Sequence, residues 1–156
     1  HLVLPNMYGP GDHLDPSRSH ALMALILKIW EAKNSGSKRV EIWGSGKPVR
    51  EWLYVEDAAE GIVRATEQYN ELEILNLGCG QGSSVRELAE TIREILDWPG
   101  DFSYDTSRPD GAPRKIFDVS RMKTALGWTP PTGLSDGIRK TIDWFLSARQ
   151  ASTATH

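Results

Sequence analysis

Val40–Gly61, with the sequence VEIWGSGKPVREWLYVEDAAEG, contains the pattern that decides the fold expected of this chain. Apolar and polar residues alternate up to Trp43, which predicts a strand, and the glycines that follow predict a tight turn. A second strand is predicted after Arg50, while Glu56 and Asp57 place negative charge where the first turn of a helix is stabilised by it. A strand, a turn, a strand and a helix in this order indicate an α/β protein.

The remainder of the chain also alternates between predicted strands and helices. We expect strands at residues 1–4, 39–43, 51–55, 72–77 and 102–104, and helices at residues 20–34, 57–69, 85–96, 118–126 and 135–147. Ser17 or Ser19 is expected to cap the first helix, and Ser84 with Glu87 forms a capping-box sequence before the third. Residues 151–156 show no apolar periodicity and are expected to be a disordered tail.

Composition narrows the class of protein. The chain has 156 residues, which suits one domain, and we assign residues 1–150 to it. A net charge of -3 with scattered basic residues predicts no nucleic-acid partner. The longest apolar run, residues 21–29, is far shorter than the roughly 20 residues of a spanning helix, so no membrane segment is expected. The single cysteine, Cys79, excludes an internal disulfide and, with no leader at the start, indicates the cytoplasm.

A rival motif lies at Leu72–Glu87, which reads LEILNLGCGQGSSVRE. A strand, a glycine run and a helix imitate a dinucleotide fingerprint or the first motif of an S-adenosylmethionine methyltransferase. The glycines fit G-x-G-x-G rather than G-x-G-x-x-G, and Asn76 stands where a methyltransferase usually has an acid. Cys79 has no adjacent histidine or basic residue, so we do not expect it to be a nucleophile.

Four segments together resemble the GDP-L-fucose synthase family, the GDP-4-keto-6-deoxymannose epimerase/reductases of the extended short-chain dehydrogenase/reductase superfamily. They are LPNMYGPGDHLDPSRSHAL (4–22), WGSGKPVREWLYVEDAAEG (43–61), LNLGCGQGSSVRELAETI (75–92) and RPDGAPRKIFDVSRMKTALGW (108–128). The resemblance implies the carboxyl-terminal half of such an enzyme. Its fold would be α/β, a substrate-binding domain plus remnants of a doubly wound (Rossmann-type) parallel sheet.

The resemblance also implies an activity for the intact parent. That parent would epimerise a GDP-4-keto-6-deoxy sugar beside its keto group and then reduce it, with NADP or NAD as cofactor, and would be a homodimer. No tyrosine here is followed by a lysine four positions later, so the catalytic Tyr/Lys pair of the superfamily is absent from this sequence. Because the chain also starts within a predicted strand, we expect a fragment that is inactive alone, with the cofactor bound mainly by a preceding half.

Three residues of the first segment, Asn6, Met7 and His20, are assigned to cofactor binding or proton transfer. Imidazole exchanges protons near neutral pH, and the family's acid in epimerisation is the histidine at the SRSH position. The resemblance therefore gives His20 the catalytic role and a cofactor contact. It places Asn6 and Met7 at the nicotinamide end of NADP, although only the asparagine is identical to the family's residue. From the residues alone, the alternative for His20 is that it caps or packs at a helix start, and the alternative for Asn6 is that it caps a strand end.

The resemblance implies that four residues bind the nucleotide-sugar substrate: Lys28, Trp43, Arg50 and Arg114. A pyrophosphate carries about two negative charges, and guanidinium forks match phosphate oxygens. Without the resemblance, each basic residue could be a solvated surface charge, and Trp43 could pack in the core. We assign Asp57 a structural role at a helix start, paired with Arg50. No metal site is assigned.

Two alternatives remain open at the level of the sequence. The first keeps the fold but changes the chemistry to a simple 4-epimerase or dehydratase acting on a UDP, dTDP or CDP sugar. The second is a non-catalytic module that binds sugar nucleotides. A G-x-x-G-x-x-G loop and a Y-x-x-x-K motif upstream would favour an enzyme over the module.

Overall fold

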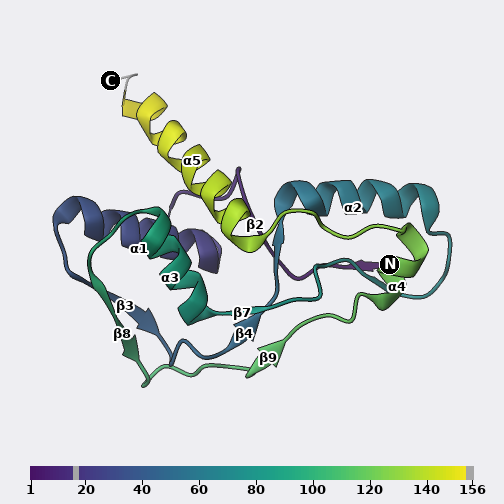
Figure 1. Ribbon diagram of the computed structural model, residues 1–156, viewed down its shortest axis with the longest axis horizontal. Coiled ribbons are helices and arrows are strands. Elements are labelled where there is room, and N and C mark those ends of the chain that lie inside the picture. Colours follow the sequence, from purple (N-terminus) through teal and green to yellow (C-terminus); the bar gives the residue numbers. More distant parts are fainter. Residues whose placement is uncertain (16–17, 154–156) are drawn as a thin grey trace.

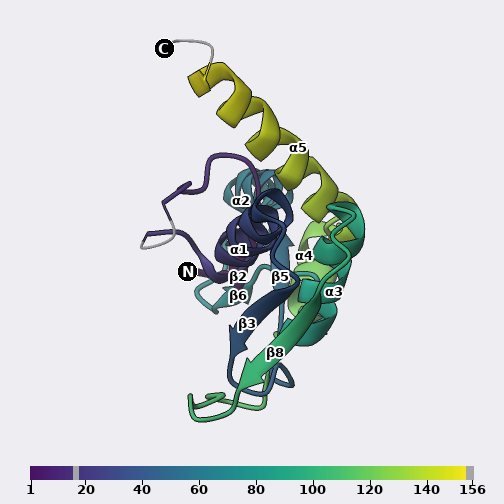
Figure 2. The ribbon, with the colours of Figure 1, turned by 90° about the vertical axis from the view of Figure 1, so that its left-hand side faces the viewer.

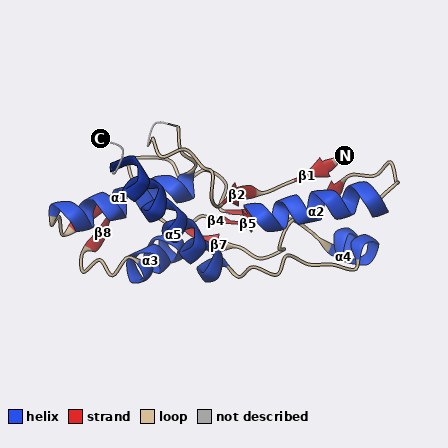
Figure 3. Ribbon diagram, turned by 90° about the horizontal axis from the view of Figure 1, so that it is seen from above, coloured by secondary structure: helices blue, strands red, loops and turns tan. Residues whose placement is uncertain are grey.

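The computed structural model describes residues 1–15 and 18–153, and this part of the chain folds into five helices and nine short strands. The helices are α1 (Ala21–Ser35), α2 (Val55–Gln68), α3 (Val85–Ile95), α4 (Ser120–Leu126) and α5 (Leu134–Thr153). Helices α1, α3 and α5 gather at one end of the molecule, and α2 and α4 lie at the other end (Figures 1 and 3). Each end has its own hydrophobic core. The molecule therefore has two lobes, which we call the α1 lobe and the α2 lobe.

The strands form small, mostly parallel sheets. The pairs are β1 (Leu2–Val3) with β6 (Leu75–Asn76), β2 (Asn6–Tyr8) with β5 (Trp52–Tyr54), β3 (Arg39–Trp43) with β8 (Asp101–Asp105), and β4 (Val49–Arg50) with antiparallel β7 (Ser83–Ser84) and parallel β9 (Arg114–Lys115). Figure 2 shows β3 and β8 side by side. Parallel strands need crossover connections, and these contain helices: α1 lies in the chain between β2 and β5, and α2 and α3 lie in the chain between β3 and β8. The predicted α/β fold is confirmed.

Helix α1 is the centre of the α1 lobe. Its apolar residues cover most of its circumference, and it packs against α3 and β3. The buried residues of this helix are Leu22, Met23, Leu25, Ile26, Leu27, Ile29 and Ala32. Burial of one such large side chain contributes about 1.5–3 kcal/mol, so α1 is fixed firmly in the lobe. The helix ends at Gly36, as expected, with that glycine in the left-handed conformation.

The predicted capping box holds the start of α3. The Ser84 hydroxyl accepts a hydrogen bond from the Glu87 amide at 3.1 Å, and the Glu87 carboxylate accepts one from the Ser84 amide at 2.7 Å. The bond from the Ser84 amide, and a further one that the Ser84 hydroxyl donates to the same carboxylate at 2.9 Å, lower the pKa of Glu87. Because Ser84 also belongs to β7, the cap fixes the strand that pairs with β4. The basic residue Arg50 is thereby held in register opposite Ser83.

The α2 lobe is smaller and closes around β6. Its buried core consists of Ala65, Leu75, Leu77, Val119, Met122 and Leu126, from α2, α4 and the segments beside them. Gly61 of α2 lies so close to Leu77 and Trp128 that a side chain at this position would overlap both. Glycine here therefore lets α2 approach the core closely.

Several predicted boundaries were wrong. Helix α2 begins at Val55 rather than at residue 57, because Tyr54 is the last extended residue and serves as the N-cap. The strand predicted at residues 72–77 contains only Leu75 and Asn76, since its partner β1 is equally short. Strands β2, β4, β7 and β9 were not predicted, because two or three residues are too few to show a period of two.

Two predictions about helix ends also need correction. The N-cap of α1 is His20, not Ser19, and Ser17 lies outside the described residues. Helix α5 continues past residue 147 to Thr153, so residues 151–153 of the expected disordered tail are helical. Residues 154–156 lie outside the described part of the chain. The apolar period alone did not predict this extension, because the last turns carry small and polar residues.

Asp57 has the structural role expected of it, but with a different partner. The side chain is buried, and its two oxygens accept hydrogen bonds from the amide and the hydroxyl of Thr132, both at 2.9 Å. Asp57 was predicted to pair with Arg50, and it binds Thr132 instead. The start of α2 is thus tied to the connection between α4 and α5.

A second buried carboxylate, that of Glu51, lies between the lobes. This residue is 1% exposed, and its two oxygens accept hydrogen bonds from the amides of Gly80, at 2.9 Å, and Phe117, at 2.8 Å. Its backbone carbonyl accepts another from the Asn6 side chain at 3.1 Å. A side chain at Gly78 would overlap the carboxylate. Four segments that are distant in sequence therefore meet at Glu51.

We expect Glu51→Gln to lower the free energy of unfolding by about 2–4 kcal/mol. The NH₂ group of glutamine would face the backbone amide of either Gly80 or Phe117, and that buried amide would then have no acceptor. Urea denaturation followed by circular dichroism measures this. The matched control is Glu60→Gln on the surface of α2, where the i,i+4 pair with Arg64 contributes less than about 0.5 kcal/mol. Equal effects of both substitutions would contradict the role of Glu51.

Candidate functional site

A cavity of about 400 Å³ brings together the three residues assigned to the cofactor and to proton transfer. It is lined by Pro5, Asn6, Met7, Tyr8, Gly9, Pro10, Gly11, Asp12, His13, His20 and Val55. We call it the His20 cavity. The lining comes from β2, the loop after it and the first residues of α1 and α2. The sequence segment 4–22 therefore folds back on itself, so that Asn6, Met7 and His20 face one space.

His20 enters this cavity from the start of α1. Its backbone is extended, with φ -71° and ψ 162°, and its side chain makes no capping hydrogen bond to the helix. The imidazole Nδ1 instead lies 3.0 Å from Oδ1 of Asp12, and the imidazole is 74% exposed. The alternative of a capping histidine is therefore wrong for the side chain. Asp12 was not among the predicted site residues, although it lies in the same segment.

Asn6 and Met7 form the wall beside β5. The Asn6 amide donates to the carbonyl of Glu51, so this side chain also has a structural bond across the parallel pair β2–β5. Met7 is 44% exposed in spite of its apolar side chain. An exposed methionine at the edge of a cavity offers a deformable apolar surface to a flat ring.

A second cavity adjoins the first. It measures about 210 Å³ and is lined by Leu4, Pro5, Asn6, Arg50, Lys115 and Phe117. We call it the Arg50 cavity. Pro5 and Asn6 line both cavities. Two cationic side chains and no carboxylate face the Arg50 cavity, so it favours an anionic group.

Lys115, rather than the predicted Arg114, lines the Arg50 cavity. Strands β4 and β9 pair in parallel, with Val49 opposite Arg114 and Arg50 opposite Lys115. Successive side chains of a strand point to opposite faces, so only one of the two basic residues of β9 shares a face with Arg50. The sequence carried no signal for this choice, because the register with β4 decides it.

Trp43 and Lys28 lie outside both cavities, on a neighbouring surface. Trp43 is 64% exposed, which excludes the core position considered from the sequence. Two cations lie near its ring, with Lys28 Nζ at 5.4 Å and Arg108 Cζ at 5.1 Å from the ring centroid. Arg108 was not predicted as a site residue.

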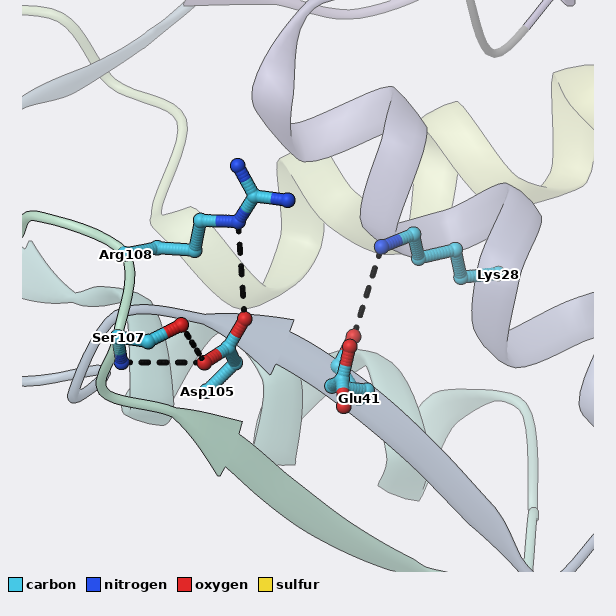
Figure 4. A network of polar contacts seen from close by, with 5 residues as sticks. All are labelled: Lys28, Glu41, Asp105, Ser107 and Arg108. Atoms are coloured by element: carbon cyan, nitrogen blue, oxygen red, sulfur yellow. Dashed lines mark hydrogen bonds and ion pairs between the residues drawn. The ribbon is translucent and has the colours of Figure 1, made fainter.

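Figure 4 shows how these cations are oriented. Lys28 Nζ donates to the carbonyl of Glu41 at 3.4 Å. The Arg108 guanidinium lies 3.6 Å from the carboxylate of Asp105, which also accepts from the amide and the hydroxyl of Ser107 at 3.0 and 2.5 Å. The Ser107 bonds lower the pKa of Asp105. The Asp105 carboxylate thus remains ionised and keeps Arg108 near Trp43.

Asp110 connects the Trp43 surface to Arg50. Its carboxylate accepts hydrogen bonds from the amide and the hydroxyl of Ser45, both at 2.6 Å, and these bonds lower its pKa. Its backbone carbonyl accepts one from Arg50 at 3.5 Å. The turn after Trp43 and the loop at residues 107–113 are therefore joined, and this link connects the Trp43 surface to the segment that carries Arg50.

Two other groups near the site are unsuited to proton transfer at neutral pH. Burial raises the pKa of Tyr8 far above its usual value, and the Tyr8 hydroxyl donates to the carbonyl of Leu134 at 3.4 Å. Burial also raises the pKa of the Cys79 thiol. The imidazoles in the wall of the His20 cavity, those of His13 and His20, are therefore the groups suited by their chemistry to proton exchange.

The described residues hold no group of three or more His, Cys, Asp or Glu side chains placed as metal ligands would be. Within residues 1–15 and 18–153, no helix combines the length and the apolar character that crossing a membrane requires.

Comparisons with known proteins converge on one family. The model of the "NAD dependent epimerase/dehydratase family" matches residues 1–78. GDP-L-fucose synthase 1 of Arabidopsis thaliana is 44% identical over 141 residues, which cover 90% of this chain and 43% of that protein. The chain therefore spans less than half the length of this curated relative.

Two solved structures have a similar fold. A GDP-L-fucose synthetase from Naegleria fowleri bound to NADP has a TM-score of 0.89 at 27% identity, over 96% of this chain and 47% of that one. A UDP-glucose 4-epimerase with UDP-glucose from Thermotoga maritima has a TM-score of 0.80 at 28% identity, over 95% and 46%. By its sequence and its fold, the chain belongs to the NAD-dependent epimerase/dehydratase family, and within that family it is similar to GDP-L-fucose synthases.

Proposed function

We propose that this chain is the sugar-nucleotide-binding part of an NAD(P)-dependent epimerase/reductase that acts on a GDP-4-keto-6-deoxy sugar. The observation that carries the proposal is the adjacency of the two cavities, with Pro5 and Asn6 in both walls. One cavity presents cations and the other presents His20. The 44% identity to a GDP-L-fucose synthase supports the same activity.

The cations are suited to the diphosphate of a nucleotide sugar. Arg50 and Lys115 lie opposite each other on paired strands, so a phosphate between them would meet a planar fork and a point charge. The Trp43 ring, flanked by Lys28 and Arg108, offers a stacking surface for a base or sugar. Both features fit a long anionic ligand that extends along the region between Trp43 and the His20 cavity.

The His20 cavity fits one end of the cofactor. Asn6 supplies an amide, Met7 an apolar surface and His20 an exposed ring, a set suited to a nicotinamide. When bound, NADP supplies the hydride for reduction of the keto group. The residues of this chain would orient the sugar carbon beside that ring, and His20 would exchange a proton with it during epimerisation. The proposal includes a homodimeric parent in the cytoplasm.

The similarity to a UDP-glucose 4-epimerase favours one alternative, a 4-epimerase that acts on a UDP sugar. Such an enzyme would use the same cationic groups for the diphosphate, because the charge of the diphosphate does not depend on the base. The choice of base therefore separates the two candidate functions.

We expect this chain to bind GDP more tightly than NADPH, because its described cations gather at the proposed substrate region. We also expect GDP to bind more tightly than UDP, because the chain is 44% identical to a GDP-L-fucose synthase. Titrations followed by isothermal calorimetry measure the three affinities. A dissociation constant near the millimolar range, about -4 kcal/mol, is sufficient to compare them. Tighter binding of NADPH would contradict the assignment of the substrate region, and tighter binding of UDP would favour the 4-epimerase.

A matched pair of substitutions tests the strand register. We expect Lys115→Met to weaken GDP binding roughly tenfold to a hundredfold, because one charged hydrogen bond contributes about 1.5–3 kcal/mol. Arg114→Met should weaken it much less, since Arg114 is on the other face of β9. The same titration measures both variants. A larger loss with Arg114→Met would return the phosphate contact to the residue predicted from the sequence.

In the full-length enzyme, we expect His20→Asn to slow formation of the epimerised product by about 10²–10⁴, the usual contribution of general acid catalysis. Reduction of the unepimerised 4-keto sugar should continue, because it requires hydride transfer rather than His20. NADPH absorbance and product stereochemistry by NMR separate the two steps. His13→Asn, in the same cavity wall, is the control. A normal rate of epimerisation in His20→Asn would remove His20 from the mechanism.

A further inference from the structure

We propose that Asp12 is a positioning residue for His20: it holds the proton of the neutral imidazole on Nδ1 and so leaves Nε2 as the atom that exchanges a proton with the substrate. This inference rests on the proposed function for its catalytic consequence. The tautomer itself does not depend on that function and is measured separately.

The contacts of Asp12 carry the proposal. Oδ1 of Asp12 accepts a hydrogen bond from the His13 amide at 2.7 Å and lies 3.0 Å from Nδ1 of His20. The Asp12 side chain is 9% exposed, whereas the His20 side chain is largely exposed. The carboxylate is thus fixed by its neighbour's backbone and by burial, while the imidazole has this one described side-chain contact.

The chemistry of the two groups decides which atom carries the proton. An ionised carboxylate only accepts hydrogen bonds, so the contact requires His20 Nδ1 to donate. When one ring nitrogen is held as a donor in this way, the other nitrogen of the neutral ring is left as the acceptor. Nε2 is therefore the basic atom of His20, and the same atom becomes the acid once protonated.

The surrounding backbone makes this pair able to orient the ring. His20 is attached to the start of α1, whose buried face is fixed in the α1 lobe. An exposed side chain on a fixed backbone still samples several rotamers. The bond to Asp12 selects one of them and points the ring into the cavity that Asp12 and His20 both line. Orientation of this kind matters to the rate, because a misplacement of about 1 Å can cost about 10²-fold.

The alternative is an incidental surface contact. Exposed ion pairs contribute little to folding stability, so stability alone cannot distinguish the two cases. The tautomer of His20 can, because an incidental contact would leave it as in a free histidine.

Long-range ¹H–¹⁵N NMR on the labelled chain at pH 8 measures the tautomer. His20 is assigned by the loss of its signals in His20→Asn. We expect the Nδ1–H form in the wild type, its loss in Asp12→Ala, and its retention in Asp12→Asn, whose side-chain oxygen still accepts a hydrogen bond. Asp101→Ala, an exposed carboxylate on β8, is the control and should change nothing. An Nε2–H form in the wild type, or an unchanged tautomer in Asp12→Ala, overturns the proposal.

Kinetics of the full-length enzyme provide the second readout. We expect Asp12→Ala to lower kcat for epimerisation about tenfold to a hundredfold with little change in KM, and Asp12→Asn to restore most of the rate. An Asp12→Ala enzyme with normal kcat would overturn the positioning role. Failure of the proposed function gives a different result: the tautomer then still depends on Asp12, while His20→Asn leaves epimerisation unchanged.

Discussion

The fold depends on a single buried carboxylate between its two lobes. Both side-chain oxygens of Glu51 are used by backbone amides, one from the glycine turn after β6 and one from the segment after β9. Its carbonyl is used by Asn6 of β2. Since burial of a polar group costs free energy unless the group is hydrogen-bonded, the three segments are stable together in an arrangement that satisfies this residue. Asn6, which binds the Glu51 carbonyl, lines both cavities of the candidate site. The hydrogen bonds of Glu51 therefore support the fold and also position a wall of the site.

Patterns that lie within one continuous segment of the sequence predicted the helices well. The apolar circumference of α1 predicted its burial, and Ser84 with Glu87 predicted the start of α3, because both signals are local. Short elements escaped prediction. Strands β7 and β9 exist only because β4 lies between them, and pairing across the chain leaves no mark in the sequence of either strand.

The candidate site was predictable in outline but not in detail. The resemblance to a known family indicated Asn6, Met7 and His20 as site residues. In the structure, all three line one cavity. Glu51 carried no comparable signal. A glutamate between Arg50 and Trp52 gives no indication of burial in the sequence, because its burial depends on the glycine turn after β6, which is distant in sequence. The same limit applies to partners chosen by tertiary contact: Thr132 for Asp57, and Asp12 for His20.

The exposure of Trp43 has an optical consequence. The chain contains six tryptophans, all in its described part, and the other five are buried or half-buried. The emission of an indole depends on its contact with water, so the exposed Trp43 differs from the rest, and it also has two cations beside its ring. A ligand that covers this ring would exclude water from it and displace the cations together. The protein thus contains its own fluorescent reporter at the edge of the region it presents to ligands, and an added label is unnecessary.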